Sequence, residues 1–166
     1  MKTTLTTICA AVSLVMTAGI AGTFFAFSVA VMPGLNAAKA TTAIESMQTI
    51  NQKIQNPAFL GAFMLAPVFA ALVGVLLWTS GQHGAAWLFF AAAAVYVVGA
   101  FLPTVAVNVP MNNDLDAVKL SGLHDAAKTW SDYTGKWTAW NHVRGLFSFV
   151  SLLLMSYATY RWAKDS

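Results

Sequence analysis

The chain has 166 residues, of which 58% are hydrophobic and only 9% are Asp, Glu, Lys or Arg. Soluble globular domains carry about 25% charged residues, so this composition excludes an ordinary soluble domain. The nine Lys and Arg residues are scattered among six Asp and Glu residues without a basic run, which argues against a nucleic-acid-binding protein.

Charged residues are missing from two long segments of the chain. No Asp, Glu, Lys or Arg occurs over residues 3–38 or over residues 54–113. A membrane-spanning helix needs about 20 mostly apolar residues, so the first segment holds one span and the second holds two. A fourth apolar run covers residues 145–160. We predict one four-span membrane domain over residues 1–166, a multi-pass protein of the plasma membrane if the chain is bacterial.

The first helix is predicted over residues 5–32. Lys2 and the apolar run after it resemble a signal peptide, but the run is much longer than an ordinary signal sequence. We therefore expect a retained membrane helix. Pro33 and Gly34 follow, and a proline–glycine pair predicts that the helix ends there.

A polar stretch over residues 35–56 separates the first two spans. Apolar residues recur at helical spacing between Ile44 and Ile54, which predicts a short amphipathic helix. Such a helix would lie at the membrane surface or cap the bundle.

The other three spans are predicted over residues 57–78, 85–107 and 138–162. Pro67 and Pro103 fall inside two of them and would bend the helices. The predicted fold class is therefore all-α: a four-transmembrane-helix up-down bundle with a short amphipathic helix in the first long loop. Glycine and alanine faces on the spans would also permit close helix contacts and a homo-oligomer.

Polar residues gather where four helix ends meet, on the side of the two long loops. These residues are Ser28, Gln48, Asn51, Asn108, Asn112, Asn141, His142 and Arg144. Trp137, Asn141 and Arg144 form one stripe of the fourth helix. Because an arginine facing lipid costs a few kcal/mol, we expect this stripe to turn inward. The sequence thus predicts a polar pocket with aromatic and methionine walls, and the aromatic ones are Phe24, Phe25, Phe27, Phe59 and Phe63.

Each polar residue also has a structural interpretation. Arg144 can reach lipid headgroups, the asparagines can join helices, and His142 can pair with an amide or a carbonyl. His124 and His142 share the long-loop side, but no metal-binding spacing occurs. A metal or a haem therefore stays an open alternative, and no cofactor is assigned.

Four motifs resemble those of the anthrone oxygenase-like family, in that family's order. They are "GTFFAFSVAVMPGL", "MQTIN", "NVPMNNDL" and the pattern W-x2-Y-x3-W-x2-W-N-H-V-R from Trp130 to Arg144. The resemblance spans nearly the whole chain. It implies a small four-helix membrane protein, and fungal pathway members of the family oxidise anthrones to anthraquinones.

The resemblance implies oxidation of a flat aromatic, anthrone- or quinol-like substrate by O2, with neither metal nor flavin required. His142 is then the candidate base. Arg144 and the amides of Asn108, Asn112 and Asn141 would hold the enolate and peroxide oxygens. The remaining predicted contacts to substrate are Phe24, Ser28, Gln48, Asn51 and Trp137.

Two other functions stay open at this point. One is a membrane protein that binds a lipid, a quinone or a small anion without catalysis, with Arg144 as the anionic contact. The other is a structural bundle subunit whose asparagines only join helices. The expected partners are a small aromatic or lipid-like molecule and the membrane lipid itself.

Overall fold

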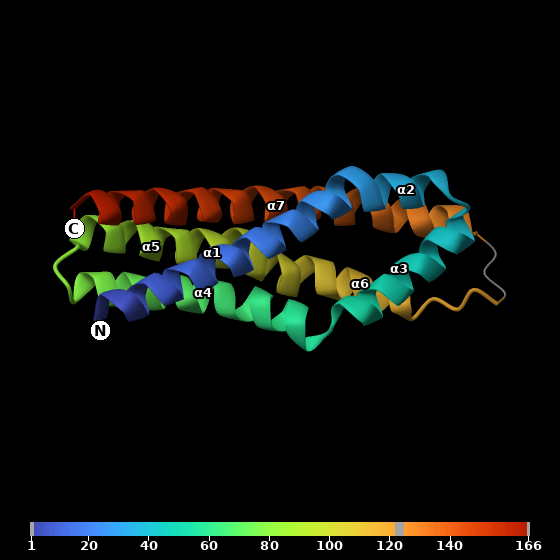
Figure 1. Cartoon of the computed structure of the whole chain (residues 1–166). Coiled ribbons are helices and arrows are strands. Elements are labelled where there is room, and N and C mark those ends of the chain that lie inside the picture. The colour runs from blue at the N-terminus through green and yellow to red at the C-terminus, as the bar shows by residue number, and fades with distance from the viewer. Residues whose placement is uncertain (1, 122–124, 166) are drawn as a thin grey trace.

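The computed structural model describes residues 2–121 and 125–165, and their regular secondary structure is helical throughout. Four long helical segments lie along one rod, and both ends of the chain lie at the same end of it (Figure 1). All four are long and apolar enough to cross a membrane. The predicted all-α, four-span fold is confirmed, and the chain is a multi-pass membrane protein.

The four segments differ in how they are built. The first consists of α1 (Lys2–Ala26), the π-helical turn η1 (Phe27–Val31) and α2 (Met32–Ala37). The second is α4 (Pro57–Trp78), and the fourth is α7 (Ala126–Asp165). The third consists of α5 (His83–Tyr96), the π-helical turns η2 (Val97–Phe101) and η3 (Thr104–Asn108), and α6 (Val109–Asp116).

The segments also differ in length, and this divides the rod into two ends. The 22 residues of α4 span ~33 Å, close to the ~30 Å of a hydrocarbon core. The 40 residues of α7 span ~60 Å. α4 therefore marks the depth of the membrane, and α2, α6 and the first part of α7 extend beyond the level at which α4 begins (Figure 1).

The predicted amphipathic helix is present as α3 (Ala40–Ile54) and packs against α2, α6 and α7. Its apolar face, which includes Ala43, Ile44 and Met47, is fully buried against residues such as Leu115 and Trp130. Of the two expected placements, α3 adopts the second and caps the bundle.

The prediction that Pro33 and Gly34 end the first helix is wrong, because the helix continues to Ala37. The third helix likewise passes its predicted end at residue 107 and continues to Asp116. Both extensions cross prolines, which lack the N–H that an α-helix needs.

A π turn precedes each proline that these helices cross. Met32 donates its N–H to the carbonyl of Phe27, five residues back, directly before Pro33. Leu102 donates in the same way to Val97 before Pro103, and Val109 donates to Thr104 before Pro110. A π turn holds one residue more than an α turn. We attribute the uninterrupted helices to this wider turn, which gives the proline ring room.

The fourth helix begins at Ala126, twelve residues before its predicted start at residue 138. Trp130, Tyr133 and Trp137 lie on the buried face of this added part. Its other faces are polar because it lies beyond the level of α4, where lipid does not demand an apolar surface. Low hydropathy there conceals the helix from a search for membrane spans.

Candidate functional site

A cavity of about 280 Å³ lies at the level where α4 begins, enclosed by all four segments and α3. Its aromatic lining consists of Phe24, Phe27, Phe59, Phe63, Phe101 and Trp137. Its polar lining includes Asn51, Thr104, Asn108, Asn112, Asn141 and Arg144. Pockets for small molecules start at about 300 Å³, so the volume suits a compact ligand better than a two-tailed lipid.

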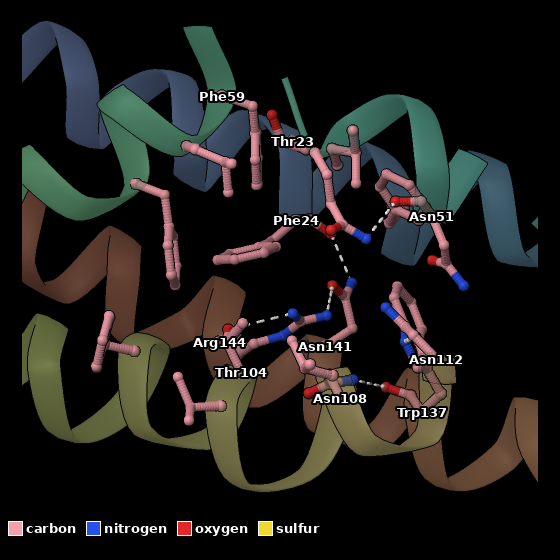
Figure 2. Close-up of a pocket in the computed structure, with 18 of the residues that line it drawn as sticks. Thr23, Phe24, Asn51, Phe59, Thr104, Asn108, Asn112, Trp137, Asn141 and Arg144 are labelled. Carbon is pink, nitrogen blue, oxygen red and sulfur yellow. Dashed lines mark hydrogen bonds between the residues drawn. The ribbon is translucent and has the colours of Figure 1, made fainter. Parts of the chain in front are cut away.

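Arg144 lies at the centre of the cavity wall, with Phe24 on one side of it and Thr104 on the other (Figure 2). Only 5% of the residue is exposed. Its Nη2 donates to Asn141 Oδ1 at 2.9 Å, and its Nη1 donates to Thr104 Oγ1 at 3.3 Å. A guanidinium has five N–H donors. Three therefore remain free, including the buried Nε, which has no partner.

Aromatic rings flank the guanidinium of Arg144. Its central carbon lies 4.5 Å from the ring centre of Phe24 and 5.1 Å from that of Trp137. Each cation–π contact contributes about 0.5–2 kcal/mol when it is shielded from water. The rings thus hold the guanidinium plane in place without using its N–H groups.

No carboxylate balances this charge within the described part of the chain. The ion pairs there are Lys128–Asp132 and Arg161–Asp165, both solvent-exposed and remote in sequence from Arg144. The cavity lining holds no acidic residue. An unpaired buried charge costs several kcal/mol, so the cavity favours a ligand that is negative or becomes negative there.

Asn141 fixes Arg144 to the first helical segment. Its Nδ2 donates to the backbone oxygen of Phe24 and to Ser28 Oγ, both at 2.8 Å. Its Oδ1 is the acceptor for Arg144. With both ends of its amide engaged, Asn141 orients the guanidinium from a fully buried position.

Two asparagines of the third segment hold Trp137 in the same way. Asn112 Oδ1 accepts from Trp137 Nε1 at 2.8 Å and from the Tyr133 hydroxyl at 2.9 Å. Asn108 Nδ2 donates to the backbone oxygen of Trp137 at 3.3 Å, while its Oδ1 is buried without a partner. The turn η3 thus places the amide of Asn108 on the site, and the helix that continues past Pro110 places that of Asn112.

Three of the predicted site residues lie outside the cavity lining, and they are Ser28, Gln48 and His142. The His142 ring is exposed, and its Nδ1 lies 2.8 Å from Ser28 Oγ. Gln48 Nε2 donates to the backbone oxygens of Leu115 and Val118, at 2.8 and 3.0 Å, and ties α3 to the end of α6. Neighbouring helical residues point about 100° apart, which explains why Asn141 faces inward and His142 does not.

The structure brings the other predicted site residues together around the cavity. Phe24, Asn51, Asn108, Asn112, Trp137, Asn141 and Arg144 all line the cavity. Phe25 was expected in the wall, but it lies 53% exposed with its ring edge-on to Phe149. Phe24 and Phe25 are neighbours on one helix and point in different directions, so only Phe24 faces the cavity.

The methionine that was expected in the cavity wall is Met64 of α4. Sequence reasoning missed its apolar neighbours at the cavity edge, which are Leu60 of α4 and Val105 and Val109 of the third segment. On each helix the two residues are four positions apart, and the valines directly follow Thr104 and Asn108. Helical spacing is therefore the signal that could have found them.

Metal ligands do not cluster in the described ranges, where no three His, Cys, Asp or Glu side chains come together. His124 lies outside the described residues. The metal and haem alternatives that use it stay hypotheses.

The geometry can now be set beside known proteins. The family model described as anthrone oxygenase matches residues 51–154, more than half of the chain. The match includes Asn51, Asn108 and Asn112 of the third segment, and the Trp137–Arg144 stripe. No curated protein and no solved structure matches the chain. The chain belongs to the anthrone oxygenase family.

Proposed function

We propose that the cavity binds a flat, weakly acidic aromatic molecule, an anthrone or a quinol, and stabilises its anion while O2 oxidises it. The observation that carries this proposal is the buried guanidinium of Arg144, with three free N–H donors and no counter-ion, facing an aromatic-walled cavity.

The chemistry requires only an anion and O2. Loss of a proton from the anthrone methylene gives a carbanion that is resonance-stabilised as a phenolate. This anion transfers an electron to O2, and the resulting radicals combine to a peroxide at the former methylene carbon. Uptake of one proton and loss of water then leave a ketone, so one anthrone and one O2 give one anthraquinone and one water.

Arg144 is the residue proposed to act on this path. Its free N–H groups would donate to the phenolate oxygen and then to the peroxide. The substrate anion would thus form beside a positive charge that is already in position. Donors that are oriented in advance contribute about 10²–10³ in rate. The rings of Phe24 and Trp137 would stack against the substrate or hold the guanidinium in the plane that it needs.

Proton removal is the step with the least support from the cavity. Among the described lining residues, Arg144 is the sole ionisable side chain. His142 reaches the site only through Ser28 and Asn141, and an amide does not pass a proton on readily. A role for His142 as base therefore needs the substrate, or a water, to approach Ser28.

The same observation favours a second candidate, a protein that binds a quinone or a small organic anion without turnover. A cavity that has one cation and no base in its lining suits binding as well as it suits catalysis. The two candidates make different predictions for O2.

The experiment uses the purified full chain in lipid nanodiscs with a dihydroxyanthrone. Anaerobic titration measures binding, and addition of O2 measures O2 uptake and quinone absorbance. One O2 consumed per quinone formed, above the rate of empty nanodiscs, supports the oxygenase. Tight binding without faster oxidation supports the binder, and neither binding nor oxidation rejects the proposal.

Three variants test the roles of individual residues. Arg144→Met is expected to lose both binding and oxidation, while Arg161→Met, an exposed arginine of the same helix, keeps both. His142→Gln tests the base: a profile of oxidation rate against pH, from pH 6 to 9, that matches the profile of the unsubstituted chain would exclude His142 from proton transfer.

A further inference from the structure

We infer that the ligand enters the cavity sideways from the membrane hydrocarbon, through an opening between α4 and the third helical segment. This inference rests on the proposed function only in taking the occupant to be a small apolar molecule. It names where that molecule comes from: the bilayer, and not the water above it.

The opening is framed by exposed apolar side chains. On α4, Leu60 is 43% exposed and Met64 is 52% exposed. On the third segment, Val105 is 53% exposed and Val109 is 42% exposed. All four line the cavity, so each side chain contacts both the hollow and the outside of the bundle.

Helix packing explains why the wall is open there. α4 packs against α1 and α5, whereas η3 packs against α7, and α6 packs against α3 and α7. The cavity occupies the space between α4 and η3. The wide turn η3 directs Thr104 and Asn108 toward α7 and leaves the two valines on the side of α4.

The depth of the opening places it in hydrocarbon. Since α4 matches the thickness of the membrane core, its first residue, Pro57, marks one boundary. Met64 lies seven residues further along, ~10 Å deeper. A molecule dissolved among the acyl chains would therefore meet this opening without leaving the bilayer.

The cavity has a second, polar edge, which is the competing route. Gln55 and Asn113 line it and are exposed, and Gln55 lies before Pro57, on the water side of the boundary. An apolar molecule entering here would first have to leave the membrane, at about 25 cal/mol for each Å² of apolar surface exposed to water. Transfer through the apolar opening exposes no such surface.

The test uses thiol labelling, which needs neither anthrone nor O2. Thr23 lines the cavity, and its hydroxyl donates to Gly19 of its own helix, so Thr23→Cys places a thiol in the hollow with little disturbance. The full chain also carries Cys9→Ala to remove its native thiol. Proteoliposomes are treated either with N-phenylmaleimide, which dissolves in the bilayer, or with a sulfonated maleimide, which stays in water.

Two blocked variants and a matched control define the route. Met64→Trp with Val105→Trp fills the opening, and Leu60→Trp alone is a milder block. Val68→Trp with Val98→Trp adds the same bulk to the same helices at positions that are 57% and 61% exposed and do not line the cavity. Equal labelling after unfolding in detergent and equal melting temperatures show that the variants are comparable.

We expect N-phenylmaleimide to label the reporter at least about tenfold faster than the sulfonated reagent, with the blocked variants slowed about tenfold and the control unchanged, because a close-packed indole leaves no passage. Faster labelling from water, or equal labelling in the blocked variants, overturns the inference. If labelling behaves as expected but anthrone is not bound, the route stands and the proposed function fails. If anthrone is oxidised but the tryptophan substitutions do not slow labelling, the proposed function stands and the route fails.

Discussion

The two ends of the rod differ in whether their buried polar groups are hydrogen-bonded. At the end that holds the termini, the core consists mainly of alanines and aliphatic residues around Phe89 and Met155. Two buried hydroxyls there are satisfied: Ser13 donates to the backbone oxygen of Ala66 at 3.1 Å, and Ser151 to that of Ala92 at 2.8 Å. At the cavity end, Arg144 Nε and Asn108 Oδ1 are buried with no hydrogen-bond partner among the residues that the structure describes. Buried polar groups are nearly always paired in proteins. This contrast agrees with the proposed function, in which one end of the rod supplies stability and the other binds the ligand.

The π turns follow the same division. All three lie in the half of the rod that contains the cavity, and each supplies a lining residue: Phe27 from η1, Phe101 from η2, and Thr104 from η3. α4 and α7 have no π turn within the described ranges. Irregular turns of this kind are frequent at functional sites, and here they set which residues face the hollow.

Replacement of Arg144 is expected to have the largest effect on the cavity end of the rod. Arg144→Met removes a buried charge that has no counter-ion within the described ranges, so we expect anthrone binding to fall by about 10²–10³. The free energy of unfolding should stay the same or rise by about 1–4 kcal/mol. Isothermal titration and thermal unfolding measure the two effects. A large loss of stability would contradict a binding role and indicate a structural one.

Trp137 and Trp140 form a matched pair on one helix. Trp137 is 4% exposed and contacts Arg144 and Asn112, whereas Trp140 is 36% exposed. Trp137→Leu should weaken binding about tenfold to a hundredfold, through loss of a cation–π contact and a hydrogen bond. Trp140→Leu should leave the binding constant unchanged. Equal effects of both substitutions would mean that the aromatic wall does not select the ligand.

Two glycines of α4 compare the two ends of the rod: Gly74 lies at the end that holds the termini, and Gly61 lies at the cavity end. A Cβ on Gly74 would lie 2.5 Å from Phe90, but a Cβ on Gly61 would meet nothing within 4 Å. Gly74→Ala should therefore lower the free energy of unfolding by about 1–3 kcal/mol, and Gly61→Ala should raise it by up to about 1 kcal/mol. Neither should change anthrone binding at a temperature where both proteins are folded. A binding defect in Gly74→Ala would show that the ends are coupled.

Thr104 gives the smallest expected effect. Thr104→Val keeps the shape of the side chain and removes the acceptor at 3.3 Å from Arg144 Nη1. Loss of one such hydrogen bond should weaken binding about threefold to tenfold. Thr159→Val, which removes a hydroxyl at the terminal end, is the control and should leave titrations unchanged.

The sequence predicts the four spans because each leaves a long gap in charge. It does not predict where the helices end. Pro33 and Pro110 are ordinary stop signals, and the π turns that accommodate them depend on packing that no local pattern encodes. The start of α7 is concealed for another reason: residues 126–137 are helical outside the membrane, where hydropathy carries no information.

The part of the site that the sequence could predict is the part in which polar residues recur at helical spacing. The stripe of Trp137, Asn141 and Arg144 has a spacing that places all three on one face, and the structure brings them together. His142 breaks that spacing, yet its chemistry and the family motif make it a candidate. The sequence could not show that Arg144 lacks a counter-ion, because that depends on where every carboxylate lies in space.

The turn η3 has a consequence for how such a cavity can change between relatives. Deleting a single residue from Thr104–Asn108 would let the wide turn close into a regular one, because a π turn holds one residue more than an α turn. The helix after the turn would keep its direction and Asn112 would keep the two α7 aromatics that it now holds, but a different set of side chains from the turn would face the cavity. A change in residue count within one turn can therefore refit this protein to a different ligand.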